Sequence, residues 1–126
     1  MPAASRVAAA SAAKASAAVF DRPGLLARLM DDQDLARTVA ETFLDDMPKQ
    51  IAALRACLAA GDAEGALRLT HTIKGASAIV GGELLRAVAF EMEKAAKAKD
   101  LSAVKSRMAE LEAQFDALKM EIGGGW

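Results

Sequence analysis

The chain has 126 residues and a formal net charge of −1, and this length favours one domain with a single modest core. Strong helix formers such as Ala, Leu, Glu and Lys are abundant, whereas aromatic residues make up only 4% of the sequence. The composition therefore predicts an all-α fold. It argues against a sheet protein, a strongly basic nucleic-acid-binding protein and a membrane-spanning protein.

The chain opens with an Ala/Ser-rich stretch, residues 1–20, which is predicted to be a flexible tail. The next residues, FDRPGLLARLM, are expected to form a short extra helical segment whose leucines cover one end of the other helices. A long helix is predicted at 34–60, where apolar residues recur at helical spacing. Pro48 lies inside it, and a kink or a break is expected there because proline removes a backbone donor and clashes with the preceding turn.

The same periodicity predicts three further helices, at 62–80, 83–98 and 101–122. Asp62 and Asp100 are suited to cap the first and the last of them, and residues 123–126 are predicted to be a flexible end. Short connections force consecutive helices to run antiparallel. The predicted architecture is an antiparallel up-down-up-down four-helix bundle over residues 21–122.

His71 is the only histidine, and it lies in the predicted helix 62–80. The buried stripe of this helix is predicted from four apolar residues: Leu69, Ile73, Ala76 and Val80. At about 100° per residue, His71 lies about 200° around the helix from both Leu69 and Ile73. We therefore predict that the imidazole points away from the core.

Residues three, four or seven positions from His71 share its face of the helix. They are Leu67, Arg68, Lys74, Gly75 and Ala78. A neutral imidazole is a good nucleophile near neutral pH, and the ammonium group of Lys74 could neutralise phosphate oxygens. Gly75 costs about 0.5–1 kcal/mol of helix stability relative to alanine, and close approach of another molecule to the imidazole would explain it.

The sequence contains no glycine-rich phosphate loop, second histidine or acid cluster that would indicate a nucleotide site, a metal site or a catalytic triad. It offers a phosphate acceptor without a phosphate source, so we predict no metal or cofactor on this chain and a partner that supplies phosphate. The single cysteine, Cys57, can form no internal disulfide. It is predicted to be a small buried residue in a cytoplasmic protein.

These residues resemble the signature of the histidine-containing phosphotransfer (HPt) domain family. In that signature, Lys-Gly follows the histidine at the third and fourth positions, and a further glycine comes ten positions after it. The matching residues are His71, Lys74, Gly75, Ala76, Ser77 and Gly81. A leucine and a Leu-Glu pair usually follow in the family, and the residues at those positions are Leu85, Met92 and Glu93. Thr70 and Gly82 replace alanines that are common in the family, at positions expected to be exposed or terminal.

The resemblance implies a phosphoryl carrier of a two-component phosphorelay without an ATP site of its own. His71 would take the phosphoryl group from the aspartate of one receiver domain and pass it to another. Lys74 would neutralise phosphate charge, Gly75 would admit the receiver, and the receiver would supply Mg²⁺. The sequence does not identify the residue that orients the histidine.

The resemblance also implies a docking patch that includes Leu67 and Ala78, with Arg68 at its edge. The implied partners are response-regulator receiver domains and a sensor or hybrid histidine kinase. No nucleic-acid or membrane partner is expected. A self-contained bundle of this kind is expected to be a monomer.

Two alternatives remain open. The first is the dimerisation and phosphoacceptor domain of a sensor kinase, where an acid usually follows the histidine directly and a proline comes a few residues later. Thr72 follows His71 here, and no nucleotide-binding domain comes after it. The second alternative is a helical adaptor that binds receiver domains without phosphotransfer.

Overall fold

The computed structural model describes residues 19–124, and all regular structure in that range is helical. Its helices are α2 (Arg22–Arg28), α3 (Gln33–Ala60), α4 (Ala63–Val80), α5 (Glu83–Lys97), α6 (Leu101–Ser106) and α7 (Met108–Gly123). The predicted tail, residues 1–20, lies almost entirely outside the described range, and so do residues 125 and 126 of the predicted flexible end. The prediction of an all-α fold is confirmed.

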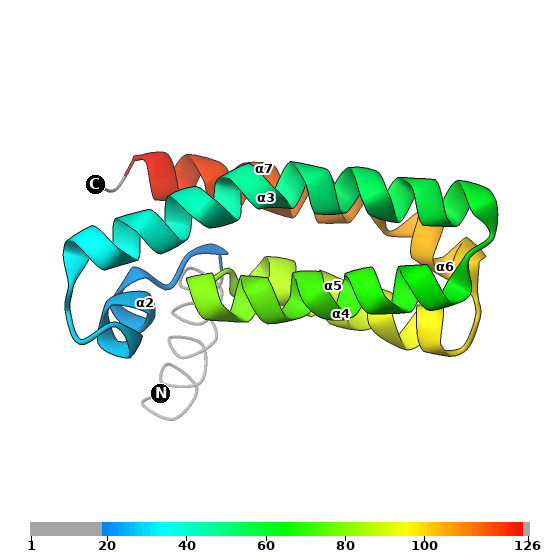
Figure 1. The fold of residues 1–126 in the computed structure, drawn as a ribbon, viewed down its shortest axis with the longest axis horizontal. Coiled ribbons are helices and arrows are strands. Elements are labelled where there is room, and N and C mark those ends of the chain that lie inside the picture. Colours follow the sequence, from blue (N-terminus) through cyan, green and yellow to red (C-terminus); the bar gives the residue numbers. More distant parts are fainter. Residues whose placement is uncertain (1–18, 125–126) are drawn as a thin grey trace, which may run out of the picture.

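Figure 1 shows α3, α4, α5 and α7 side by side, with each running in the direction opposite to the one before it. This is the predicted up-down-up-down arrangement. The short helix α2 lies at the end of the bundle where α4 stops and α5 begins (Figure 1). Its Leu25 is fully buried, and Leu26 and Leu29 pack partly buried against the core, as expected for a segment that covers one end of the bundle.

Aspartate side chains cap the first turns of several helices and so fix where these helices begin. The carboxylate of Asp62 accepts a hydrogen bond from the backbone N–H of Gly65 at 2.9 Å, and that of Asp100 accepts one from Ala103 at 3.1 Å. Asp32 does the same for Leu35 at 3.0 Å. Each carboxylate satisfies a donor that the helix itself leaves unpaired. The predicted caps at Asp62 and Asp100 are confirmed.

The buried side of α4 differs from the predicted stripe. Ile73 and Val80 are fully buried as predicted, but Leu69 and Ala76 are only partly buried. Two hydroxyl residues point inward instead, Thr70 and Ser77, both of them fully buried. Their burial is possible because each hydroxyl donates a hydrogen bond to the carbonyl four residues earlier on the same helix, at 2.8 Å and 2.7 Å. The prediction that Thr70 is exposed is therefore wrong.

Pro48 does not break its helix, because α3 continues from Gln33 to Ala60. Figure 1 shows only a change of axis direction in the first half of α3. The residues on either side of the proline, Met47 and Ile51, are buried in the core, and this packing holds the helix together across the missing hydrogen bond.

The last predicted helix, 101–122, is in fact interrupted at Arg107, which separates α6 from α7. The backbone N–H of Arg107 bonds to the carbonyl of Val104 at 3.1 Å, and the hydroxyl of Ser106 donates to Ala103 at 2.7 Å. Both are three-residue steps that tighten the turn locally. No proline or glycine lies at the interruption, and the spacing of apolar residues continues unchanged across it. The interruption could therefore not be predicted from these two signals.

The turn between α4 and α5 depends on two glycines. Gly81 has φ of +90°, and the backbone N–H groups of Gly81 and Gly82 bond to the carbonyl of Ser77 at 3.1 and 2.8 Å. The carbonyl of Gly81 in turn accepts a hydrogen bond from the backbone of Asp21 at 2.8 Å. A Cβ on Gly82 would lie 2.6 Å from a terminal methyl group of Leu118 of α7, so alanine there would require the Leu118 side chain to shift.

Three glycine-to-alanine substitutions should give a graded series in urea unfolding. At Gly81 the left-handed backbone and a contact of 2.7 Å between the new Cβ and the Asp21 carbonyl act together, and the expected loss of unfolding free energy is about 2–3 kcal/mol. Gly61 has a positive φ but open space around it, so about 1 kcal/mol is expected. Gly75 has open space and ordinary helical geometry, so alanine there should add about 0.5–1 kcal/mol. An equal cost at Gly81 and Gly61 would contradict the close packing of Asp21 on the turn.

Candidate functional site

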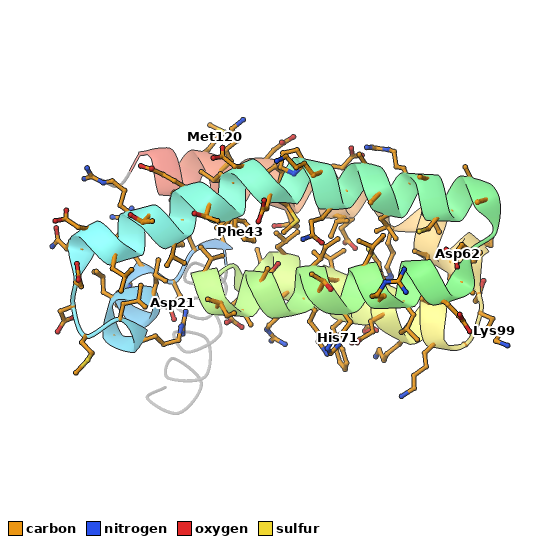
Figure 2. All side chains as sticks on the ribbon, viewed as in Figure 1. Asp21, Phe43, Asp62, His71, Lys99 and Met120 are labelled. Atoms are coloured by element: carbon orange, nitrogen blue, oxygen red, sulfur yellow. The ribbon has the colours of Figure 1, made fainter. Side chains whose placement is uncertain are left out.

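His71 lies near the middle of α4 on the face that points away from α3 and α7, as Figure 2 shows. Its side chain is 68% exposed. The buried residues before and after it, Thr70 and Ile73, hold this part of the helix against the core. The predicted orientation of the imidazole is therefore confirmed, and one ring edge is open to a second molecule.

Glu93 of α5 contacts the imidazole directly. One oxygen of its carboxylate, Oε2, lies 2.6 Å from His71 Nδ1, and the other, Oε1, accepts a hydrogen bond from Lys74 Nζ at 2.7 Å. One carboxylate thus links two side chains of α4 that are a single helical turn apart. The Glu93 side chain is only 15% exposed, so these contacts lie at the base of the site.

The charge state of Glu93 determines which ring nitrogen carries the hydrogen. The hydrogen bond from Lys74 lowers the pKa of the Glu93 carboxyl, and the hydrogen bond with His71 lowers it further, against the effect of burial. An ionised carboxylate can only accept hydrogen bonds. Nδ1 of His71 must therefore be the donor, and in the neutral ring Nε2 keeps its lone pair on the exposed side.

The Lys74 side chain is partly buried. It is only 27% exposed, because the ammonium group is paired with Glu93 and also lies 5.4 Å from the ring centroid of Phe90. Its positive charge therefore has a fixed place, about one helical turn from His71. Lys74 therefore lies near the imidazole, as predicted, but its ammonium group is bonded to the same carboxylate that contacts His71.

Gly75 is exposed, and a Cβ built on it would have no heavy atom of the described residues within 4 Å apart from the adjacent backbone of α4. The fold therefore does not require glycine at this position. At Gly24, by contrast, a Cβ would lie 2.2 Å from the carboxylate of Asp21, which caps the same helix and would have to shift. The absence of any intramolecular reason at Gly75 supports the interpretation that something outside the chain approaches there.

The three predicted docking residues are placed differently. Leu67 is partly buried and Arg68 is exposed, and both line an open pocket between α4 and α5 together with His71. Ala78 is partly buried two turns further along α4 and does not line this pocket. The structure thus brings Leu67 and Arg68 to the imidazole, whereas Ala78 extends the same helix face.

Glu93 is the orienting residue that could not be identified from the sequence, although a signal for it was present. Residues at equal distances from a tight turn lie side by side in two antiparallel helices, because both rise by the same length per residue. His71 comes eleven residues before Gly82, and Glu93 comes eleven residues after it. The same count places Phe90 beside Lys74. Counting from the turn would have named the carboxylate.

Other chemistry is disfavoured at the residues that the structure describes. Within 19–124, no cluster of three or more His, Cys, Asp or Glu side chains is arranged to hold a metal ion. Burial and the carboxylate of Asp62 raise the pKa of the Cys57 thiol, which disfavours the reactive thiolate. Over the same range, every helix is too short or too polar to cross a membrane.

Comparison with known proteins agrees with this geometry. The family model described as Hpt domain matches residues 38–121. The structure resembles the crystal structure of histidine-containing phosphotransfer protein B from Pseudomonas aeruginosa PAO1, with a TM-score of 0.78 and 25% identity over 83% of this chain and 91% of that one. No protein in the curated comparison matches the sequence.

A second similar fold is the HPT domain of the Hpt sensor hybrid histidine kinase from Shewanella, with a TM-score of 0.73 and 18% identity over 86% of this chain and 93% of that one. At that identity the likeness concerns the fold alone. The family match, in contrast, spans most of the chain and includes the whole of α4 and α5. The chain belongs to the Hpt domain family and is a histidine phosphotransfer protein of two-component phosphorelays.

Proposed function

We propose that His71 Nε2 is the atom that carries the phosphoryl group between receiver-domain aspartates. The observation that carries this proposal is the contact between Nδ1 and Glu93, which leaves Nε2 as the free nitrogen on a ring that is 68% exposed. A ring held in this way presents its nucleophilic lone pair without rearrangement.

The transfer can be written from the geometry of His71 alone. The Nε2 lone pair attacks the phosphorus of an aspartyl phosphate on the opposite side from the aspartate oxygen. The new N–P bond forms as that P–O bond breaks, and the aspartate leaves as a free carboxylate. In the second transfer, the carboxylate of another receiver attacks the phosphorus, and the imidazole leaves with its electron pair.

Glu93 and Lys74 are proposed to assist these steps in different ways. Once Nε2 is bonded to phosphorus, the ring carries positive charge, and the Glu93 carboxylate stabilises it through Nδ1–H. Lys74 fixes the orientation of Glu93 and brings a cation close to the incoming phosphoryl oxygens. We propose that Mg²⁺ is held by the receiver and that this chain contributes no nucleotide site.

The face around His71 is proposed to receive the partner. Gly75 adds no side chain to this face and so leaves room beside the imidazole. Leu67 and Ala78 contribute apolar surface, and Arg68 contributes a charged edge. Such contacts need to be small, because the carrier has to leave one receiver before it meets the next. We propose that the partners are a sensor or hybrid histidine kinase and response-regulator receivers, and that the chain acts as a monomer.

A cytoplasmic location is proposed as well, since the thiol of Cys57 is free and such thiols persist in a reducing compartment.

Replacement of His71 by glutamine should abolish transfer, because an amide has no nucleophilic nitrogen at the position of Nε2. The measurement is the uptake of radioactive phosphate from a panel of the source organism's receiver domains, each phosphorylated with labelled acetyl phosphate. Ala113→Gln is the matched control, since Ala113 is exposed and belongs to α7, from which the His71 side chain points away. Label on the His71→Gln protein would show that another residue is the acceptor. Receiver binding without transfer by the unmodified protein would support the adaptor alternative instead.

Gly75→Leu should lower kcat/KM for transfer by about tenfold or more, because a bulky side chain beside the imidazole displaces the incoming phosphate. The helix itself should be at least as stable as before, since leucine favours helix and the position has open space. Ala113→Leu provides the control for an added leucine on an exposed helix face. Unchanged transfer by Gly75→Leu, measured at several receiver concentrations, would remove the proposed reason for the glycine.

A further inference from the structure

Phe90 of α5 is an exposed aromatic residue that the fold does not use. Its relative exposure is 42%, and it is neither in the hydrophobic core nor among the partly buried residues packed against it. It lines the same open pocket as His71 and Leu67, one helical turn before Glu93. A large apolar side chain beside a reactive residue is the kind of feature that interfaces use, since aromatic residues are enriched where proteins meet.

The ring of Phe90 is held in position by its neighbours. Lys74 Nζ lies 5.4 Å from the ring centroid and Lys94 Nζ lies 4.8 Å from it, both within the range of a cation–π interaction. Each lysine is fixed in turn by a carboxylate, Lys74 by Glu93 at 2.7 Å and Lys94 by Glu91 at 2.6 Å. A partner therefore meets a side chain whose freedom is already reduced, which lowers the entropy cost of binding.

Cationic side chains outnumber carboxylates in the lining of this pocket. Arg68, Lys94 and Lys97 line the pocket along with Lys74, whereas the carboxylates in its lining are those of Glu64 and Glu93. Glu93 is already engaged by Lys74 and His71. Lys97 is exposed at the C-terminal end of α5, where the helix dipole also favours a cation. The surface thus offers an apolar anchor with a cationic border.

We propose that Phe90 and Lys97 form a partner-selecting surface on α5, which binds a receiver domain whose docking face presents an apolar recess bordered by carboxylates. This inference rests on the proposed phosphotransfer function and adds to it a second helix that the sequence did not identify as a docking element. Phe90 provides most of the affinity by burial, as central anchors do in protein interfaces. Lys97 accelerates encounter through charge, since peripheral charges act mainly on association rates.

The first test is Phe90→Ala, with transfer followed against the receiver that gives the fastest transfer to the unmodified protein. The half-saturating receiver concentration should rise by about fivefold or more, while the rate at saturation stays unchanged, because Lys74, the one neighbour of the ring that takes part in transfer, keeps its hydrogen bond to Glu93. Met120→Ala is the matched control, since Met120 is also exposed but belongs to α7. Phe90→Leu, which keeps apolar bulk at the position, should be affected less than Phe90→Ala.

The second test is Lys97→Glu against Lys119→Glu, an exposed lysine on α7. The half-saturating concentration should rise about threefold at low salt for Lys97→Glu only, and the difference should disappear at about 0.5 M salt.

The outcomes separate this inference from the proposed function. Unchanged half-saturation for Phe90→Ala, in a protein that transfers normally, would overturn the α5 surface and leave the phosphoryl carrier intact. A lower saturating rate with unchanged half-saturation would also overturn it, because Phe90 would then act on the chemistry. No transfer by the unmodified protein to or from any receiver would contradict the proposed function itself, and the inference would fall with it.

Discussion

The contact of the Glu93 carboxylate with both His71 and Lys74 is the interaction on which the site depends. It forms only if α4 and α5 are in the right register. That register is set at the turn, where Gly81 adopts φ of +90° and its carbonyl accepts a hydrogen bond from the backbone N–H of Asp21. The backbone at Asp21, the turn and the site are therefore parts of one arrangement. A shift of one residue in the turn would move the carboxylate about 100° around its helix and away from the imidazole.

The same contact indicates which parts of the transfer reaction this chain provides. Within the protein, Glu93 fixes the ring and the position of its hydrogen, while burial of Thr70 and Ile73 holds the backbone of α4 in place. The outer edge of the ring is left open, next to a glycine that the fold does not require. We propose that everything else that phosphoryl transfer needs, including the phosphate and the metal ion, comes from the receiver. Such an arrangement would suit the proposed carrier, which accepts a phosphoryl group from one partner and passes it to another.

The apolar periodicity was sufficient to predict the helices and the outward direction of His71, because both depend on spacing along a single helix, and the short connections predicted the antiparallel order. The periodicity failed where side chains satisfy their own backbone. Thr70 and Ser77 are buried because their hydroxyls bond within α4, and Ser106 marks an interruption that no glycine or proline announces. Glu93 was missed for another reason, since its role depends on the alignment of two helices. That alignment can be counted from Gly82 only once the turn is known to be tight.

The most direct test of the central claim is the hydrogen position on the imidazole of the unphosphorylated protein. His71 is the only histidine, so the ¹⁵N spectrum of the labelled protein contains a single imidazole. At mildly alkaline pH, Nδ1 should give the resonance of a protonated nitrogen and Nε2 that of an unprotonated one, and Glu93→Ala should lose this preference. A hydrogen on Nε2 in the unmodified protein would contradict the account, because the nitrogen that faces the receiver would then have no lone pair to offer.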